Sequence, residues 1–465
     1  MSPHAGAAAP VLGSPGAEPR WLQHPADVNA LLPALWPATA HRGDDGALRI
    51  GGLDVRSLAA EFGTPAYLLD VADFRERAAE FRTAFAGFDV YYAGKAFLCT
   101  EVARWVHTLG LGLDVCSGGE LAVALRADFD PARIAYHGNN KSTAELARAL
   151  DVGVGRIVVD SLDEIDRLEA LAAHRDRRVS VLARVTTGVD ADTHPFITTA
   201  LEDQKFGFSL ASGAALSAVR ALLASSRLHL CGLHSHIGSQ VFDSAGFDAA
   251  IRRLLTLSAR VRDELGVELP ELNVGGGFGV AYTTRDHPQP PAVLAAGIRR
   301  TVERGCAALG LAVPALAIEP GRAIAGPSTV TVYEVGTVKH VSLGGTSRRY
   351  VSVDGGMSDN IRAALYGADL SCTLASRRST APAALTRVVG KHCEAGDVLV
   401  RDEFLPRDVR PGDLLAVPGT GAYGRSMASN YNHLSRPPVV AVGDGTARLV
   451  VRRETEDDLL RLDVP

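Results

Sequence analysis

The stretch Gly112-Leu-Asp-Val-Cys-Ser-Gly-Gly-Glu120 contains the unit that decides the fold, because the same arrangement recurs along the chain. A short β-rich run ends in a small or polar residue, and a helix start follows at once. Ser117 and Glu120 have the spacing of a capping box, in which each side chain accepts a backbone N–H at the first turn of a helix. The same Ser-x-x-Glu spacing returns at 142–145 and 161–164. Each copy therefore predicts a strand that leads directly into a helix.

This βα pattern runs from Tyr91 to Pro320 and predicts strands at eight places. They are Val90–Ala96, Gly112–Cys116, Ile134–His137, Ile157–Asp160, Val181–Val185, Gly232–Ile237, Leu272–Gly275 and Leu316–Glu319. Eight βα repeats favour an α/β fold of the (β/α)8 TIM-barrel type. No Gly-x-Gly-x-x-Gly follows the first strand, which argues against an open dinucleotide-binding sheet.

After Gly321 the sequence becomes mostly β. Strands are predicted at Thr329–Val341, Arg349–Val353, Val398–Val400, Leu414–Val417, Val439–Val442 and Ala447–Val451. We expect Leu48–Asp54 and Pro65–Leu69, which precede the barrel, to pair with this half. The predicted organisation is a flexible tail over 1–24, an N-terminal segment of the β domain over 25–69, a barrel over 70–322 and a β-sandwich or barrel over 323–465.

The composition is that of a globular protein, with 46% hydrophobic and 22% charged residues among 465. The formal net charge of −5 does not point to nucleic acid or an anionic membrane as a partner. No apolar run reaches the length of a membrane span. The 6 cysteines form no Cys-x-x-Cys pair, so we expect neither a zinc site nor a disulfide framework. A reducing cytoplasm fits this cysteine usage best.

Lys95 closes the first predicted strand, and active sites of such barrels form at the C-terminal ends of the strands. Two interpretations are open for this lysine. Its stem can pack in the strand while its ammonium group reaches solvent. Alternatively it is a Schiff-base lysine, whose pKa is depressed by desolvation at the mouth of the barrel.

Further polar residues follow the later strands. They are His137 and Asn139 after the third strand, His234, His236 and Ser239 after the sixth, Gly275–Gly279 after the seventh and Glu319–Arg322 after the eighth. Gly275–Gly277 is either a tight turn or a loop whose bare backbone amides bind a phosphate. Glu319 either pairs with Arg322 or faces a pyridine nitrogen. His236 is either a core histidine or a ring stacked on a cofactor.

Ten segments, in order between about Gly63 and Pro437, resemble the fold-type III pyridoxal-phosphate decarboxylases. They are Tyr92–Ala96, Leu113–Glu120, Tyr136–Lys141, His194–Gly207, His234–Ser239, Gly275–Gly279, Glu319–Arg322, Asp359–Tyr366, Cys393–Asp397 and Gly421–Asn432. The Glu-Asp-Gln-Lys-Phe-Gly stretch that ends at Gly207, together with Cys393-Glu-Ala-Gly-Asp397, resembles the branch that decarboxylates meso-2,6-diaminopimelate to L-lysine and carbon dioxide.

The resemblance implies pyridoxal 5'-phosphate as the cofactor and assigns two catalytic residues: Lys95 holds the cofactor covalently, and Cys393 returns a proton to the substrate. The implied cofactor-binding residues are Lys95, His236, Ser239, Gly277, Glu319, Gly321, Arg322 and Tyr423, with Glu319 at the pyridine nitrogen and His236 on the ring face. The implied substrate-binding residues are Arg322, Arg362, Tyr366, Glu394 and Tyr423. A homodimer with shared active sites is also implied, in which the partner subunit's Cys393 and Glu394 complete each site.

Alternative activities on the same scaffold predict different polar residues. Diaminopimelate has a distal carboxylate, which suits bidentate arginine, and a distal amine, which suits Glu394. A decarboxylase of ornithine or lysine would have no distal carboxylate for Arg322 and Arg362 to hold. A racemase fits Cys393-Glu394 and the long β half less well, and a non-catalytic binding protein would not need Lys95.

Overall fold

The computed structural model describes residues 19, 21–189, 205–342 and 347–464. The chain divides into two compact units. The barrel unit comprises Phe74–Val280 and His287–Gly326, and the β unit comprises Met1–Asp73, Ala281–Asp286 and Pro327–Pro465. In the part of the chain that is described, no helix is both long and apolar enough to cross a membrane.

The barrel unit is built on parallel strands that close on themselves. In spatial order they are β9 (Val179–Thr186), β11 (Leu228–His234), β12 (Glu271–Asn273), β13 (Ala315–Ile318), β5 (Phe88–Ala93), β6 (Gly112–Val115), β7 (Ile134–Tyr136) and β8 (Arg156–Val159), and β8 pairs with β9 to complete the ring. The short β10 (Phe208–Ser209) adds to β9 outside the ring. The predicted (β/α)8 barrel is thus confirmed, with every expected strand present to within a few residues.

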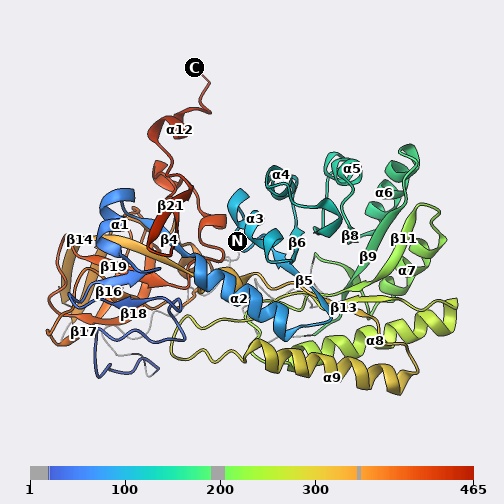
Figure 1. The fold of residues 1–465 in the computed structure, drawn as a ribbon, viewed down its shortest axis with the longest axis horizontal. Helices are drawn as coiled ribbons and strands as arrows, with labels where there is room; N and C mark the ends of the chain where they lie inside the picture. Colours follow the sequence, from blue (N-terminus) through green and yellow to red (C-terminus); the bar gives the residue numbers. More distant parts are fainter. Residues whose placement is uncertain (1–18, 20, 190–204, 343–346, 465) are drawn as a thin grey trace, which may run out of the picture. The chain divides into compact units, whose positions relative to one another are not determined.

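Helices alternate with these strands and flank them (Figure 1). They are α2 (Val71–Ala84), α3 (Thr100–Thr108), α4 (Gly118–Arg126), α5 (Thr143–Val152), α6 (Leu162–His174), α7 (Ala214–Ala224), α8 (Ala245–Leu265), α9 (Pro291–Leu309) and α10 (Arg322–Ala325). The two longest, α8 and α9, pack side by side. This arrangement buries both faces of the parallel sheet, as near-continuous apolar strands require.

The serine residues predicted to start helices do so, with one difference in detail. Ser142 forms the full capping box with Glu145. The hydroxyl groups of Ser117 and Ser161 each accept the expected backbone N–H three residues on, at 3.2 Å. The two partner glutamates, however, reach one residue further back and accept the N–H of the last residue before the cap. A capping box was therefore the wrong prediction for these two starts, although the N-caps themselves are correct.

The β unit contains a sheet with the order β18-β17-β15-β14-β4-β20-β21. Its strands are β4 (Ala66–Asp70), β14 (Thr329–Ser342), β15 (Ser347–Val353), β17 (Ala383–Val389), β18 (Val398–Pro406), β20 (Val439–Gly443) and β21 (Thr446–Val451), and β19 (Leu414–Pro418) pairs with both β14 and β16 (Thr373–Leu374). The strand expected at Pro65–Leu69 is β4, which lies between β14 and β20. Strands β16 and β17 had no counterpart in the sequence prediction.

The stretch Leu48–Asp54 does not join this sheet. It splits into β2 (Leu48–Ile50) and β3 (Leu53–Asp54), which form a separate small sheet with β1 (His41–Arg42). The cause is the Gly51-Gly52 turn, where both residues have positive φ and the chain folds back on itself. The apolar side chains of β2 still contribute to the main core of the β unit.

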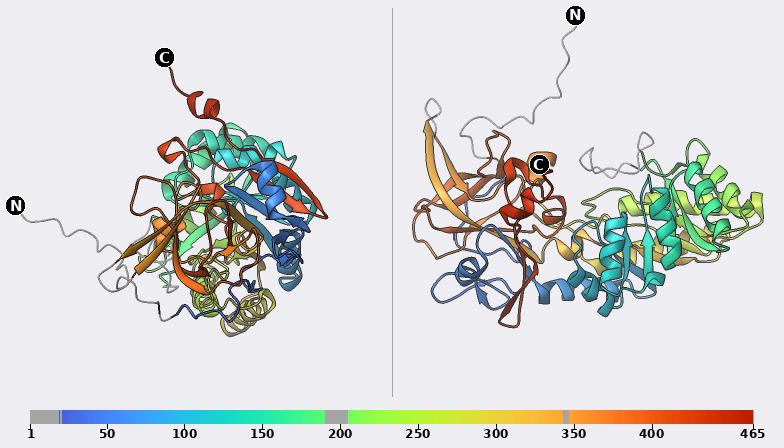
Figure 2. Two further views of the ribbon diagram at one scale, coloured as in Figure 1. Left: turned by 90° about the vertical axis from the view of Figure 1, so that its left-hand side faces the viewer. Right: turned by 90° about the horizontal axis from the view of Figure 1, so that it is seen from above.

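The longest strand of the β unit, β14, has two different halves. Its first residues are buried and lie between β4 and β19. Its C-terminal half is mostly exposed and continues with β15 as an extended hairpin (orange in Figure 2). Three short helices, α1 (Val55–Phe62), α11 (Arg362–Tyr366) and α12 (Glu456–Leu460), complete the unit.

Candidate active site

The C-terminal ends of the barrel strands bring a buried carboxylate, Glu319, against three polar side chains. Nε2 of His137 lies 3.1 Å from Oε1 of Glu319, and Nε2 of His234 lies 3.3 Å from Oε2. Asn273 at the end of β12 donates to Oε1 at 2.7 Å. These residues come from four different strands or strand ends, which is how a parallel barrel assembles a site.

The electrostatic state of this cluster follows from burial and from the facing charges. Burial alone would raise the pKa of Glu319, but the facing His137 and His234 outweigh it and hold that pKa well below its usual range. Burial lowers the pKa of His234 to about 4. Glu319 is therefore a fixed negative charge at the base of the barrel mouth, and a protonated ring nitrogen is the kind of group that it would stabilise.

Lys95 follows β5 in a turn, two residues beyond the end of the strand, and not within the strand as predicted. Its Nζ lies 3.7 Å from Oδ2 of Asp114, which sits on the neighbouring β6. Asp114 is buried, and its Oδ1 also lies 3.5 Å from Nε2 of His137. Burial raises the pKa of Asp114, although His137 and Lys95 oppose that effect. One chain of ionisable groups thus runs from Lys95 through Asp114 and His137 to Glu319.

The glycine run after β12 brings backbone close to backbone. A Cβ on Gly276 would lie 2.2 Å from the carbonyl oxygen of Glu319. A Cβ on Gly277, where φ is +105°, would lie 2.4 Å from the carbonyl oxygen of Gly238. The backbone amide of Gly276 donates to Nδ1 of His236 at 3.2 Å, and burial lowers the pKa of that histidine well below its ordinary value. The run therefore ties the loop after β11 to the loop after β13.

Ser239 and Arg322 meet beside this loop, because an Nη of Arg322 donates to Oγ of Ser239 at 2.8 Å. Gly321 precedes α10, and a Cβ there would lie 2.8 Å from the carbonyl oxygen of Ala93 in β5. A hydroxyl group, a guanidinium group and glycine backbone thus gather at one place. These are the groups that bind a phosphate or a carboxylate.

The β unit carries the remaining predicted residues. Arg362 and Tyr366 begin and end α11. The guanidinium carbon of Arg362 lies 4.0 Å above the ring of the buried Tyr282, a cation–π contact that fixes the side chain. Tyr423 has a φ of 59°, in the left-handed region that a non-glycine residue seldom adopts.

Cys393 and Glu394 lie exposed in a loop that Asp397 holds in shape. The carboxylate of Asp397 accepts the backbone N–H of Met357 at 2.6 Å and that of His392 at 2.8 Å. The Glu394 carboxylate raises the pKa of the Tyr431 phenol. The Cys-Glu-Ala-Gly-Asp motif is therefore a fixed loop that presents its thiol and its first carboxylate outward.

The predicted site residues thus fall into two groups, each placed within its own unit. The barrel unit holds Lys95, His236, Ser239, Gly277, Glu319, Gly321 and Arg322, and the β unit holds Arg362, Tyr366, Cys393, Glu394 and Tyr423. Most of the predicted motif His194–Gly207 lies outside the described residues. Of its last residues, Gly207 donates its backbone N–H to Asp160 at 2.8 Å, and Phe206 lies under the guanidinium group of Arg184 at 4.3 Å.

Three buried residues of the cluster had no role in the sequence prediction: Asp114, Asn273 and Arg184. Asp114 lies on the buried β6 within the recognised segment Leu113–Glu120, and Asn273 ends β12 just before the recognised Gly275–Gly279. A polar residue at such a position is the signal that could have found them, because a buried polar group needs a partner.

Comparison with known proteins identifies the family. Residues 71–326 match the family model of the pyridoxal-binding domain of pyridoxal-dependent decarboxylases. The diaminopimelate decarboxylase of Mycobacterium tuberculosis is 55% identical over 440 residues, which is 93% of this chain and 98% of that protein. The chain belongs to the pyridoxal-dependent decarboxylases. The diaminopimelate decarboxylase of Bacillus subtilis is 46% identical over 431 residues, 92% of this chain and 97% of that protein.

A solved structure of the family supports the same family assignment. The diaminopimelate decarboxylase of M. jannaschii in complex with L-lysine superposes with a TM-score of 0.86 at 31% identity and covers 93% of this chain and 99% of that one. Relatives of the diaminopimelate decarboxylase group thus match nearly the whole chain, β unit included. The expected family and its cofactor, pyridoxal 5'-phosphate, are confirmed.

The residues at the barrel mouth fit such a cofactor. Oδ2 of Asp114 and Nδ1 of His234 are buried and have no hydrogen-bond partner within the described residues, so the site offers polar atoms to a bound group. A primary amine at Lys95, a fixed carboxylate at Glu319 and the glycine cradle with Ser239 match an aldehyde, a pyridine nitrogen and a phosphate, respectively. The family cofactor has these three groups.

Proposed function

We propose that this decarboxylase converts meso-2,6-diaminopimelate to L-lysine and carbon dioxide, the last step of lysine biosynthesis, in the cytoplasm. The observation that carries the proposal is the near full-length similarity to diaminopimelate decarboxylases at 45–55% identity. The cluster of Lys95, Asp114 and Glu319 at the barrel mouth supplies the matching chemistry.

Pyridoxal phosphate, when bound, withdraws electrons from the amino acid joined to it and so makes loss of the carboxylate feasible. Glu319 keeps the ring nitrogen protonated, because its own pKa is held low and it remains a negative charge. Lys95 supplies the amine that holds the cofactor between turnovers, and Asp114 keeps that amine at the mouth of the barrel. His236 covers the ring face, and Gly277, Gly321 and Ser239 bind the phosphate.

The distal end of the substrate selects diaminopimelate over other diamino acids. Within the β unit, Arg362 and Tyr366 bind the distal carboxylate, and Glu394 pairs with the distal amine. Arg322, in the barrel unit, is a further candidate for the carboxylate. A bidentate guanidinium group favours a substrate with a distal carboxylate. A substrate that forms a diamine has no such carboxylate, so the two N–H donors of the guanidinium group would lose their acceptor. Tyr423 contacts both the cofactor and the substrate.

Cys393 completes the reaction by delivering the proton of its thiol to the substrate Cα atom that has lost carbon dioxide, and solvent then restores the thiol proton. We propose that the enzyme is a homodimer in which the partner subunit's Cys393 and Glu394 complete each site. Cys393 and Glu394 are both exposed in this chain, so they are accessible to the site of a partner subunit.

A substrate panel tests the proposed function. Carbon dioxide release from meso-diaminopimelate, ornithine, arginine and lysine is measured at equal concentrations with the purified holoenzyme. Release from meso-diaminopimelate should exceed the others by several orders of magnitude, as a site built around polar groups permits. Faster release from ornithine, arginine or lysine would replace the proposal with a diamine-forming decarboxylase.

A further inference from the structure

The β unit contains a pocket that has no part in the proposed reaction. Its volume is about 150 Å³, comparable to a cavity that holds a benzene-sized molecule. The floor consists of β18 and the residues before β16, and the segment from Trp21 to Trp36 covers it. The pocket has both apolar and polar walls, which is typical of a site for a small amphipathic molecule.

A carboxylate on the floor of this pocket, that of Glu403, has no cationic partner among the residues that the structure describes. Its two oxygens accept the backbone N–H groups of Phe404 at 2.9 Å and Cys372 at 3.4 Å. Among the ion pairs of the described residues, none involves Glu403. Burial raises the pKa of Glu403 to about 7. The anionic form is therefore costly in the free protein, and a bound cation would stabilise it.

The side walls are aromatic. Trp21, Trp36 and Phe404 line the pocket. One of these rings already binds a cation, because the guanidinium carbon of Arg285 lies 4.1 Å from the centre of the Trp21 ring. Aromatic faces combined with a desolvated carboxylate are the groups that recognise organic cations.

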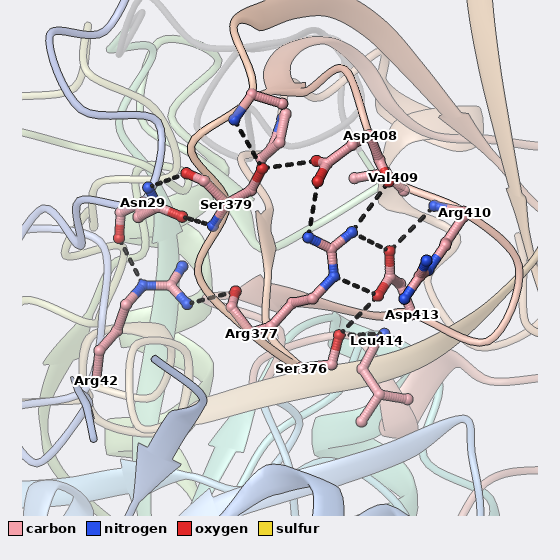
Figure 3. A network of polar contacts seen from close by, with 12 residues as sticks. Asn29, Arg42, Ser376, Arg377, Ser379, Asp408, Val409, Arg410, Asp413 and Leu414 are labelled. Atoms are coloured by element: carbon pink, nitrogen blue, oxygen red, sulfur yellow. Dashed lines mark hydrogen bonds and ion pairs between the residues drawn. The ribbon is translucent and has the colours of Figure 1, made fainter. Parts of the chain in front are cut away.

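The covering segment is fixed by specific contacts. Asn29 exchanges two hydrogen bonds with the backbone of Ser379, each of 2.9 Å (Figure 3). Arg42 donates to the carbonyl oxygen of Asn29 at 2.6 Å and to that of Leu374 at 2.9 Å, and to the hydroxyl group of Thr373 in the pocket wall at 2.9 Å. The Arg42 side chain thus donates to neutral oxygens, so Arg42 does not compensate the charge of Glu403.

We propose that this pocket is a second ligand site, which binds a small organic cation of the alkylammonium class between Glu403 and the aromatic walls. The cation takes the place of the missing ion-pair partner, and its alkyl groups contact Trp21, Trp36 and Phe404. An occupied site holds the covering segment against β18, so the ligand stabilises the β unit without entering the barrel.

The test uses tetramethylammonium, which cannot react with an aldehyde cofactor, and tert-butanol, a neutral molecule of similar size. Two of the protein's 3 tryptophans line the pocket, so tryptophan emission of the holoenzyme reports binding directly. Tetramethylammonium should change the emission saturably and raise the melting temperature. An equal concentration of tert-butanol should not, because the selectivity comes from charge.

Glu403→Gln keeps the shape of the side chain and removes the charge, so it should weaken tetramethylammonium binding by about tenfold or more. Glu334→Gln, an exposed change on β14, is the matched control and should leave binding unchanged. Trp21→Leu, at a partly exposed position of the covering segment, should also weaken tetramethylammonium binding. This second variant keeps the test decisive if Glu403→Gln does not fold. Equal binding of tetramethylammonium and tert-butanol, unchanged affinity in Glu403→Gln, or no saturable signal would each overturn the proposal.

Discussion

The Nζ atom of Lys95 lies 3.7 Å from Oδ2 of Asp114, and the aspartate is buried whereas the lysine side chain is 36% exposed. The carboxylate therefore helps to hold the amine at the barrel mouth. We predict that Asp114→Asn slows recapture of pyridoxal phosphate by cofactor-free protein by about fivefold, since an ion pair with one partly exposed partner contributes at most about 1 kcal/mol. Absorbance of the bound cofactor measures the rate.

Asp89→Asn is the control for this prediction, because Asp89 is an exposed residue of the adjacent β5. The cofactor-free Asp89→Asn variant should bind pyridoxal phosphate at the rate of the unaltered protein. If Asp114→Asn recaptures the cofactor at the rate of the unaltered protein, Asp114 does not position Lys95.

His234 makes the stability of the barrel unit depend on pH. Its pKa is lowered to about 4 by burial, below the ordinary 6.5, so the folded state favours the neutral ring. The resulting stabilisation is fully present above pH 6.5 and is lost as the pH falls towards 4. The loss is at most about 1.4 kcal/mol per pH unit for one group.

The measurement compares urea unfolding of the unaltered protein and His234→Gln between pH 7 and pH 5. Asp359 and Glu403, whose pKa values burial raises to about 7, act in the opposite direction in both proteins, so the difference between the two isolates His234. We expect the difference in the free energy of unfolding to shrink as the pH falls. A difference that is constant with pH would show that His234 is not buried as a neutral ring.

Lys141 and Glu164 form an ion pair of 2.6 Å in which each side chain is 1% exposed. Lys141 also donates to the carbonyl oxygens of Gly138 and Val158, which fixes the loop that carries His137. Lys141→Met leaves a buried carboxylate without its partner and should lower the free energy of unfolding by about 3–5 kcal/mol. Chemical denaturation of the cofactor-loaded protein provides the value.

Two further variants sharpen this prediction. Lys141→Met combined with Glu164→Leu removes both charges and should recover much of the loss. Arg260→Met breaks an ion pair in which Arg260 is 49% and Glu264 36% exposed, and should cost less than about 1 kcal/mol. If Lys141→Met costs no more than Arg260→Met, the buried pair does not stabilise the loop.

The sequence predicts the barrel well because its information is local. Each strand is a short apolar run, and Ser117, Ser142 and Ser161 mark the helix starts at the end of three of them. The β unit is harder, because β17 breaks the apolar pattern with Thr386 and Arg387. The partner of Arg387 is Asp402, on the neighbouring strand, at 3.7 Å.

The candidate site shows the same division. Lys95, Glu319 and Cys393 were predicted as site residues from sequence motifs, because each lies in a recognisable local pattern. Asp114 and Asn273 were not predicted as partners, since the atoms that they contact come from other strands of the barrel. Sequence order hides these pairs, and only closure of the barrel brings them together.

A conservative change at Arg362 tests its proposed role in binding the distal carboxylate of the substrate. Arg362→Lys keeps the positive charge but loses the planar fork and the stacking on Tyr282. The KM for meso-diaminopimelate should rise by about tenfold or more, and kcat should fall less. Steady-state kinetics give both constants. Arg410→Lys, at an exposed position of the same unit, should change neither, and an unchanged KM in Arg362→Lys would place the distal carboxylate elsewhere.

Lys95 is the residue that we propose holds the cofactor. Reduction of the holoenzyme with borohydride fixes the cofactor to the lysine that carries it, and mass spectrometry of the digested protein identifies that residue. We expect one labelled peptide, the one that contains Lys95, and no label after the change Lys95→Ala. A label on Lys141 or on any other lysine would contradict it.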